Sequence, residues 1–414
     1  MLTPMFKKLL LLPAAVLSFQ LHAQVTPEIS CWIRNTTNAT GYNNIPSNVQ
    51  TVQYSASNVY ISCTCIPGYS IGPWQGNPNV PSNQNFVFKL TRTPQQNTGT
   101  AVNVGLGHIG VWSNGVSIFN ADDGMTYNNA GVWHRNAYFW EGPSFDNCLG
   151  HPQQSGEYHH HVSPNCLYDQ ADSTHHSPII GYAFDGFPIY GAYGYTNTDG
   201  TGAIKRMASS YRLRNITDRT TLPGGGTASS AGPAISATYP LGAYIQDYEF
   251  ATGSGDLDDH NGRFCVTPDY PNGIYAYFVT IDATLTPVYP YTLGTTYYWT
   301  VQAGNTGPGS GHNTITETTT VYTGPSAVGD IETIKYKFYP NPIQDFAYIY
   351  FEPGSANNIV GKVYNSMGQL MTTTSYMQPS ISYALDLSTF PAGVYTLHML
   401  SEGKAVMQRI VVTR

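Results

Sequence analysis

The sequence contains few charged residues: they make up 10% of its 414 residues, whereas aromatic residues make up 13% and tyrosine alone occurs 32 times. The shortage of Lys and Glu, together with many Tyr, Thr, Val and Gly residues, argues against long helices and favours short strands joined by frequent turns. The formal net charge is −7 at pH 7, so we expect no nucleic-acid partner.

Long apolar segments are also missing, apart from one run near the start. Lys7 and Lys8 precede the apolar stretch Leu9–Phe19, and Ala23 offers a small residue at a cleavage point. The run is too short to span a bilayer, so we expect residues 1–23 to be a secretory signal peptide. The mature protein should then lie outside the cytoplasm, with no transmembrane segment.

Several common catalytic motifs are absent from the sequence. It has no H-E-x-x-H zinc motif, no G-x-S-x-G nucleophile elbow and no dinucleotide-binding fingerprint. The Gly-rich run that begins at Leu222 lacks the Lys-Ser/Thr of a phosphate-binding loop, and we interpret it as an ordinary loop.

Cysteine is scarce as well, with six residues in the chain. An even number in an exported protein favours disulfides over thiolate metal ligands. Cys148 and Cys166 bracket a histidine-rich stretch and would close a short loop, so we expect them to pair, with Cys265 as a competing partner for either. The remaining cysteines are Cys31, Cys63 and Cys65.

The organisation of the chain predicts a mainly β protein. Residues 24–302 contain many short strand-like runs, and FDGF at Phe184–Phe187 predicts a hairpin turn. Residues 303–334 are rich in Gly, Thr and Ser, which predicts a linker. Alternating runs over residues 335–414 predict a small β-sandwich. We therefore expect a central all-β domain of short, mainly antiparallel strands, followed by a β-sandwich domain.

Histidine is concentrated in one part of the chain: six of the twelve residues lie between His151 and His176. The densest stretch is EYHHH, which we expect to be a strand. Side chains alternate along a strand, so His159 and His161 should share one face while His160 lies on the other. Two imidazoles on one face suit zinc, copper, iron or nickel. The alternative is a set of hydrogen-bonded histidines without a metal.

Further metal ligands would have to come from neighbouring segments. His151 and His176 are the first candidates, followed by four carboxylates. If the site is catalytic, Glu157 or Asp185 would serve as the general base beside a metal-bound water. The weaker ligand candidates are Asp146, Asp185, Asp256 and Asp258.

The run DLDDHNG, which begins at Asp256, is also compatible with a calcium loop. Its Asp256-x-Asp258 start fits such a loop, but Gly262 stands one place late for the EF-hand turn and no Glu stands at the twelfth position. An Asp-rich turn explains the same residues. Calcium is therefore a weaker prediction than zinc or copper.

The C-terminal region resembles the type A sorting domain of the bacterial type IX secretion system. This resemblance implies recognition by the type IX secretion machinery, export across the outer membrane and removal of the tail on arrival. The protein would then be secreted or attached to the outer-membrane surface. The matching segments are YPNP (Tyr339–Pro342), VYNSMGQL (Val363–Leu370), LDLSTFPAGVYTLHM (Leu385–Met399) and the ending Lys404–Arg414.

The central region resembles the YHYH domain family, with core motifs over about residues 105–280. His160 stands where the family has its second Tyr, on the strand face opposite the expected ligand pair. The resemblance implies a domain and a candidate region but no reaction. The matching segments are NGVSIFN (Asn114–Asn120), FDNCLGHP (Phe145–Pro152), GEYHHHVSP (Gly156–Pro164), HSPIIGYAFDGFPIYG (His176–Gly191), DLDDHNGR (Asp256–Arg263) and GIYAYFVT (Gly273–Thr280).

Three functions are compatible with these observations. The first is a secreted or cell-surface protein that binds a metal through its histidine-rich strand. The second is a metal-dependent extracellular enzyme, in which an open coordination position would face a pocket. The third is a structural or adhesive surface domain without a metal.

Overall fold

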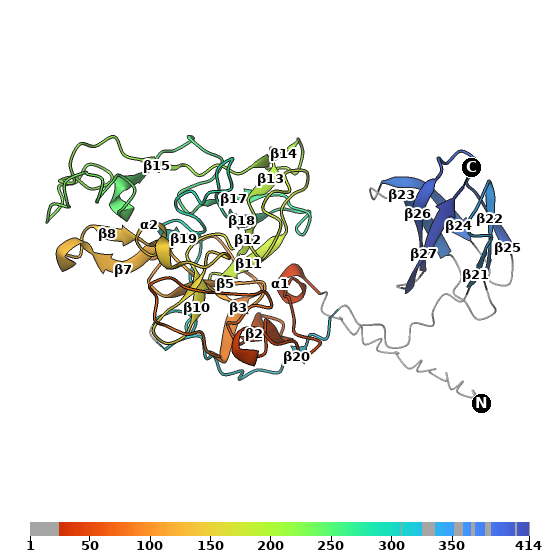
Figure 1. Cartoon of the computed structure of the whole chain (residues 1–414), viewed down its shortest axis with the longest axis horizontal. Helices are drawn as coiled ribbons and strands as arrows, with labels where there is room; N and C mark the ends of the chain where they lie inside the picture. Colours follow the sequence, from red (N-terminus) through yellow and green to blue (C-terminus); the bar gives the residue numbers. More distant parts are fainter. Residues whose placement is uncertain are drawn as a thin grey trace, which may run out of the picture. The chain divides into compact units, whose positions relative to one another are not determined.

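The computed structural model describes residues 25–307, 309–324, 336–351, 359–365, 369–376, 382–401 and 404–413. The expected signal peptide lies outside these residues. The chain divides into two compact units between Tyr322 and Thr323, and strands are the main regular secondary structure of each (Figure 1).

A four-stranded sheet forms one layer of the first unit, in the order β20-β1-β2-β3. The strands β1, β2 and β3 follow one another in an antiparallel meander. Their bounds are Val49–Tyr54 (β1), Asn58–Cys63 (β2), Phe86–Thr91 (β3) and Thr320–Val321 (β20).

An eight-stranded sheet forms the other layer, in the order β17-β18-β12-β11-β5-β6-β10-β9. It is mixed, because β10 pairs with β6 and β12 pairs with β18 in parallel, whereas the other pairs are antiparallel. The strands are His108–Trp112 (β5), Ser117–Phe119 (β6), His151–Pro152 (β9), Tyr158–His160 (β10), Ile179–Ala183 (β11), Pro188–Tyr190 (β12), Gly262–Cys265 (β17) and Ile274–Phe278 (β18).

Smaller two-stranded sheets and short helices complete the first unit. None of the helices in the described part of the chain is long and apolar enough to cross a membrane. The pairs are Val102–Asn103 (β4) with Thr296–Tyr297 (β19), Asp122–Thr126 (β7) with His134–Asn136 (β8), Tyr193–Tyr195 (β13) with Ile204–Arg206 (β14), and Tyr211–Leu213 (β15) with Tyr248–Phe250 (β16). The helices are Pro27–Ser30 (α1), Ala137–Trp140 (α2), Tyr42–Asn44 (η1), Tyr127–Asn129 (η2), Gly142–Ser144 (η3) and Ile245–Asp247 (η4).

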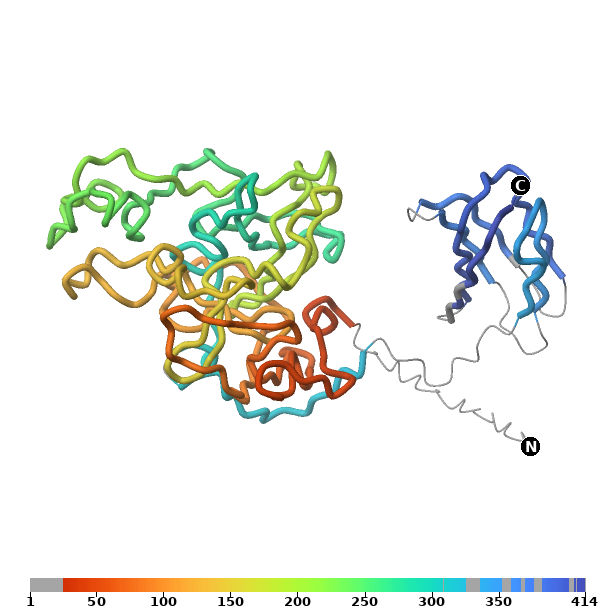
Figure 2. Tube along the Cα trace, viewed as in Figure 1, coloured from red at the N-terminus to blue at the C-terminus, as the bar shows by residue number. Residues whose placement is uncertain are grey.

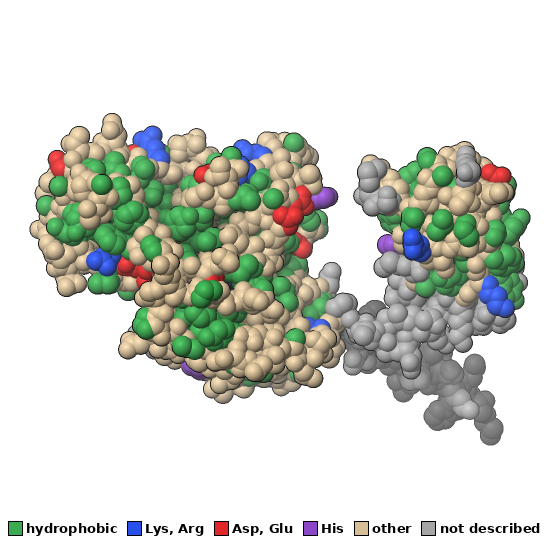
Figure 3. Space-filling view, viewed as in Figure 1, with side chains coloured by type: hydrophobic (Ala, Val, Ile, Leu, Met, Phe, Trp, Pro, Cys, Tyr) green, Lys and Arg blue, Asp and Glu red, His purple; other side chains and the backbone are tan. Residues whose placement is uncertain are grey.

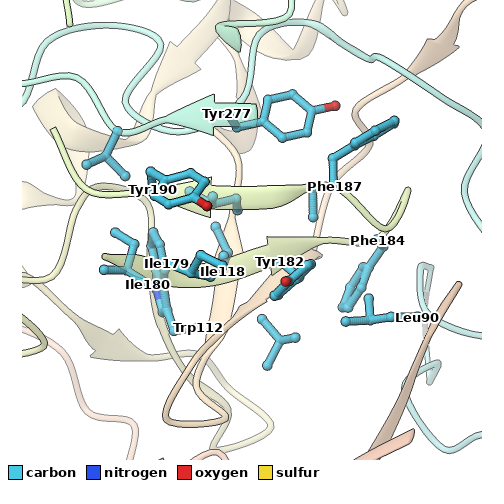
Figure 4. Packing of buried hydrophobic residues seen from close by; sticks show 14 of the residues in the cluster. Leu90, Trp112, Ile118, Ile179, Ile180, Tyr182, Phe184, Phe187, Tyr190 and Tyr277 are labelled. Carbon is cyan, nitrogen blue, oxygen red and sulfur yellow. The ribbon is translucent and has the colours of Figure 1, made fainter. Parts of the chain in front are cut away.

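One hydrophobic core joins the two large sheets. Leu90 of β3 belongs to the same buried cluster as Trp112 of β5 and Tyr190 of β12. Figure 4 shows these side chains together with Tyr182 of β11 and Tyr277 of β18, which belong to the same buried cluster. Each large aromatic side chain buried in this cluster removes on the order of 150–250 Å² of surface from water, which stabilises the fold.

The FDGF segment forms the predicted hairpin between β11 and β12. Ala183 N donates to Phe187 O, and Gly186 at the turn has a φ of +91°, a conformation that favours glycine. The hairpin lies in the middle of the eight-stranded sheet, and both of its strands are buried throughout.

Residues 303–307 and 309–322, which composition assigns to a linker, pack against the first unit instead. β20 pairs with β1, and Val87 N of the edge strand β3 donates to Gly311 O. Asn305 is fully buried and bonds the backbone of Lys89 through both atoms of its amide. These bonds cover a sheet edge that would otherwise leave backbone groups without partners, a requirement that composition does not reveal.

The expected disulfide between Cys148 and Cys166 is present, with the Cα atoms 5.2 Å apart. The loop that it closes carries β9 and β10. Cys265, the competing partner, is a buried free cysteine.

The second unit is the expected small β-sandwich. A three-stranded sheet, β21-β22-β25, and a four-stranded sheet, β24-β23-β26-β27, contribute to one buried cluster. The strands are Tyr336–Tyr339 (β21), Phe346–Phe351 (β22), Ile359–Asn365 (β23), Leu370–Tyr376 (β24), Ser382–Asp386 (β25), Gly393–Ser401 (β26) and Lys404–Val412 (β27).

The surface of the first unit follows from its composition. Figure 3 shows hydrophobic and uncharged polar side chains over most of the visible face, with scattered charged ones. An extension made by β7 and β8 lies beside the segment around η4 (Figure 2), where Asn136 N donates to Ala243 O and His134 N donates to the side chain of Gln246. This extension leads directly into α2.

Candidate metal centre

Four side chains converge at one edge of the eight-stranded sheet. Glu141, His151, His159 and His161 each present one ligand atom, and all four atoms lie within 4.8 Å of one another. His159 Nε2 is 3.1 Å from the Nε2 atoms of both His151 and His161. Glu141 Oε2 is 2.9 Å from His161 Nε2 and 3.6 Å from His151 Nε2.

Strand pairing brings the three histidines together. β10 pairs with β9 so that His159 lies directly opposite His151. His159 and His161 share a face, as alternation along the strand predicts. His160 lies on the other face, where its ring packs against Trp112 and Tyr158.

Glu141 comes from a different element, the end of the short helix α2. The side chain of Asn136 caps this helix by accepting from Tyr138 N, and Glu141 N donates to Ala137 O. The helix therefore begins at the end of β8 and lasts for one turn. The carboxylate of Glu141 is 30% exposed, whereas the side chains of His151 and His161 are 7% and 3% exposed, so Glu141 lies on the solvent side of the cluster.

The opposite nitrogen of each imidazole is held by an oxygen. His159 Nδ1 donates to Glu157 O at 3.1 Å, and His161 Nδ1 donates to Asn120 O at 2.6 Å. Carbonyl oxygens only accept hydrogen bonds, so in both neutral rings Nδ1 carries the proton and Nε2 carries a lone pair.

The same assignment holds for His151. Its Nδ1 is 2.8 Å from Ser144 Oγ, and this hydroxyl donates its own proton to Glu141 O. When the hydroxyl donates to Glu141 O, Ser144 Oγ accepts from His151 Nδ1, and this arrangement leaves Nε2 of His151 as a third lone-pair nitrogen.

Three nitrogen lone pairs and a carboxylate oxygen thus meet with no proton between them. Glu141 Oε2 has no hydrogen-bond partner although it is buried. Four of the separations, 2.9–3.6 Å, are close to the spacing of about 3.3 Å between ligand atoms around a tetrahedral ion with bonds of about 2.0–2.1 Å, and all pairs lie within 4.8 Å. The donor set therefore fits a transition metal ion.

The protonation states agree with this geometry. Burial lowers the pKa of His159 well below its ordinary value, and burial also lowers that of His151. Burial alone would raise the pKa of Glu141, but when His151 and His161 carry protons on Nε2, their hydrogen bonds and charge outweigh burial and lower this pKa to about 2. A cation held by the Nε2 lone pairs would favour the ionised carboxylate in the same way. Ligand histidines must be neutral and ligand carboxylates ionised, so the site is in the correct state at neutral pH.

A pocket of about 500 Å³ opens onto the cluster. Phe119 forms part of its wall and stacks on His159 at 3.8 Å between ring centres. Polar residues predominate elsewhere along the wall, so a ligand there would meet amide and carboxylate groups. They include Asn77, Asn79, Asp122, Asp123, Gln153 and Gln154.

Several residues considered from the sequence lie outside the cluster. The ring of His176 packs against Tyr190 and Tyr195, and its Nδ1 bonds Ser177 O. Asp146 accepts from the Tyr158 hydroxyl and from the backbone of the loop that leads to His151, so it supports the site without facing it.

The remaining carboxylates have partners of their own. Asp185 is buried and accepts from the Tyr277 hydroxyl and from Trp299 N. Asp256 pairs with Lys205, and Asp258 accepts from the Tyr275 hydroxyl.

Glu157 bonds His108 and Gln153, so its carboxylate is directed away from the cluster although its carbonyl holds His159. Among the residues that the structure describes, the Glu141 cluster is the one group of three or more His, Cys, Asp or Glu side chains with ligand atoms this close together.

Glu141 was not among the residues predicted from the sequence. It stands in AYFWEG, a segment with no histidine and no ligand spacing. Its place in the cluster depends on the β7–β8 extension and on the single turn of α2, neither of which produces a periodic pattern.

Two family models match the chain. Residues 87–290 match the family described as YHYH protein, and residues 337–413 match the family described as secretion system C-terminal sorting domain. The chain has no significant match among curated proteins. The sorting domain indicates type IX export, which places the protein in the secreted or cell-surface location.

Proposed function

The chain is a YHYH family protein with a C-terminal type IX sorting domain, and from this premise we propose that its YHYH domain is an extracellular metal-binding module. The ligands are Glu141, His151, His159 and His161. The observation that carries the proposal is the meeting of four acceptor atoms for which the described residues offer no donor, since a cation satisfies all four at close range.

The ligand chemistry favours zinc or copper(II). Imidazole nitrogen suits both ions, and a single carboxylate adds one negative charge. Calcium prefers six to eight oxygen ligands, which this cluster does not offer. When bound, such an ion would act as a Lewis acid.

The supporting contacts hold the ligands in place before any ion arrives. Ser144, Glu157 O and Asn120 O fix the orientation of the three imidazoles. Partners of this kind typically contribute 10- to 100-fold to metal affinity. The site is therefore preorganised on its histidine side, whereas Glu141 is the most exposed ligand.

The test is metal content measured by elemental analysis. The exported protein is stripped with a chelator, reloaded with zinc or copper and freed of excess ion. We expect one ion per chain for the wild type and none for the His159→Asn/His161→Asn variant. The matched control is His175→Asn, because His175 is an exposed histidine outside the cluster. Absence of metal in the wild type, or equal metal in the double variant, would contradict the proposal.

A metal-dependent hydrolase is a second candidate, and the pocket beside the ligands favours it. Neither Glu157 nor Asp185 faces the cluster, so neither suits the role of base there. Asp123 lines the pocket, and burial raises its pKa to about 6, which suits a general base near neutral pH. This candidate predicts a hydrolytic activity that a chelator abolishes, that zinc or copper restores, and that Asp123→Asn lowers by about 100-fold or more.

A further inference from the structure

A second constellation lies on the other side of Glu157, apart from the four metal ligands. Glu157 Oε1 is 3.0 Å from His108 Nδ1, and His108 Nε2 is 2.9 Å from Ser310 Oγ. The side chains of His108 and Glu157 are 7% and 5% exposed, whereas Ser310 is half-buried. Carboxylate, imidazole and hydroxyl therefore stand in line, with the hydroxyl on the outside.

The hydrogen bonds among Glu157, His108 and Ser310 have defined donors and acceptors. A carboxylate only accepts hydrogen bonds, so His108 Nδ1 donates to Glu157 and its Nε2 carries the lone pair. Ser310 Oγ–H can then donate to Nε2. The hydroxyl also lies 2.6 Å from Gly307 O, so its single proton alternates between these two acceptors. In the orientation toward His108, the imidazole is placed to remove that proton.

The surrounding structure holds the imidazole and the carboxylate firmly. The ring of His108 makes edge contacts with Phe86, Phe88 and Phe184 at 5.3–5.9 Å between ring centres. The second oxygen of Glu157 accepts from Gln153 Nε2 at 2.6 Å. Packing and hydrogen bonding of this kind are what fixes the rotamers of a working side chain.

The segment that carries Ser310 is anchored on both of its faces. Gly311 N donates to Gly304 O, and Gly311 O accepts from Val87 N of β3. Gly311 has a φ of +83°, and an added Cβ would lie 2.9 Å from the rings of Phe86 and Phe88. A residue with a side chain cannot replace this glycine without a shift, so the chain is held close to the sheet where Ser310 meets His108.

A cavity of about 500 Å³ adjoins Ser310. Gln84, Ser155 and Gln153 provide polar groups along its wall, and Phe86 and Leu106 provide apolar surface. A cavity of this size accepts a small ester, with apolar surface for the acyl chain and amide groups for its oxygens.

We propose that Ser310, His108 and Glu157 form a serine hydrolase site for carboxylic esters with small acyl groups. Ser310 Oγ bonds to the carbonyl carbon as its proton moves to His108 Nε2, and the alcohol leaves with that proton when the ester C–O bond breaks. Water then attacks the acyl-serine, gives a proton to the same nitrogen, and the carboxylic acid departs as Ser310 regains its hydrogen. Ser310 and His108 are the catalytic residues, and Glu157 is a positioning residue that fixes the tautomer of His108.

The first test is covalent labelling of the full chain with a fluorophosphonate, which forms a bond from serine oxygen to phosphorus and releases fluoride. Peptide mapping by mass spectrometry should place the adduct on Ser310. Ser310→Ala should abolish the label, whereas the control Ser57→Ala, an exposed serine that does not line the cavity, should leave it unchanged. A wild-type chain without an adduct on Ser310 would overturn the proposal.

The second test separates the base from the positioning residue. His108→Gln should slow labelling, and hydrolysis of p-nitrophenyl acetate, by about 100-fold or more. Glu157→Gln should slow both by at least ~10-fold, and Glu157→Asp should recover part of the loss because the carboxylate is restored. Unchanged rates of labelling and hydrolysis in His108→Gln would show that the imidazole of His108 is not the general base.

A chelator distinguishes this site from the metal centre. Labelling and ester hydrolysis at Ser310 should persist at full rate after the metal has been stripped, whether or not the metal centre functions as proposed. If stripping removes the activity and Ser310→Ala does not, the chemistry belongs to the metal centre and the serine proposal is wrong.

Discussion

The stretch around β10 and the turn Asp256–Gly262 are both rich in residues that bind metals, but their hydrogen bonding is opposite. In the turn, Asp256 accepts from the ammonium of Lys205, and Asp258 accepts from the hydroxyl of Tyr275. The carboxylates of Asp256 and Asp258 are therefore matched with donors. Its acidic residues tie a loop to the sheet without an added cation.

Around β10 the donors are missing. His151, His159 and His161 use their Nδ1 protons on oxygens away from the cluster and direct lone pairs toward Glu141. The difference shows that ligand-type residues alone do not predict a metal site. What distinguishes the site is a group of acceptors that the protein leaves without donors.

Removal of the disulfide is the first test of this comparison, because the disulfide constrains the histidine-rich stretch around β10 and not the turn Asp256–Gly262. It closes the loop between Cys148 and Cys166, which carries both β9 and β10. The Cys148→Ser/Cys166→Ser variant should lower the free energy of unfolding by about 3 kcal/mol. The measurement is urea unfolding, with Cys31→Ser, a free cysteine, as the control. A loss below about 1 kcal/mol would mean that the loop is held by its other contacts.

A single carboxylate substitution on each side sharpens the comparison. Glu141→Gln removes the charged ligand and should weaken zinc or copper binding by about 10- to 100-fold. The same change at Asp256, Asp256→Asn, should leave metal affinity unchanged because Asp256 is occupied by Lys205. Competition with a chromophoric chelator measures both. Equal affinity in the two variants would remove Glu141 from the ligand set.

A substitution at Ser144 tests the hydrogen bond that orients a ligand rather than a ligand itself. Ser144→Ala removes the acceptor for His151 Nδ1, so the imidazole loses its orientation and the affinity should fall by about 10-fold. Thr174 offers a control, since its hydroxyl bonds the exposed His175, and Thr174→Ala should have no effect. An unchanged metal affinity in Ser144→Ala would show that packing alone orients His151.

The substitution His160→Tyr should give the smallest effect, and it should change the stability of the fold rather than the metal affinity. Burial lowers its pKa to about 3, whereas the ordinary value in the unfolded chain is about 6.5. The unfolded state therefore binds more protons below pH 6.5, so stability is complete above that pH and falls as the pH decreases toward 3. From pH 7 to pH 5.5, the metal-free wild type should lose about 1 kcal/mol more than His160→Tyr.

Thermal or urea unfolding at the two pH values measures this difference. Metal affinity should be the same in both proteins, because His160 lies on the strand face away from the cluster. A His160→Tyr protein with the same pH dependence as the wild type would contradict the assignment of His160 as a buried neutral residue.

Much of the histidine side of the site was predictable from the sequence. Strand alternation places His159 and His161 on one face, and the short loop between Cys148 and Cys166 brings His151 beside them. These are local relations, which depend on strand period and on a short chain separation. The β-sandwich tail was predictable for the same reason, since its strands alternate and follow one another in sequence.

The other features depend on contacts between distant segments. Glu141 reaches the cluster through an irregular extension, and Ser310 meets His108 across 202 positions of chain. Ser310 also stands in a Gly-rich segment whose composition predicts a linker. No periodic pattern or residue spacing in the sequence predicts that this segment covers the edge of β3.

X-ray absorption spectroscopy of the metal-loaded chain tests the metal centre most directly, because it reports the donor atoms. We predict scattering from about three imidazole nitrogens and one carboxylate oxygen at about 2.0–2.2 Å. A sulfur shell at about 2.3 Å would assign the ion to thiolates instead. Either that shell, or an ion with no imidazole neighbours, would contradict a metal centre built from Glu141, His151, His159 and His161.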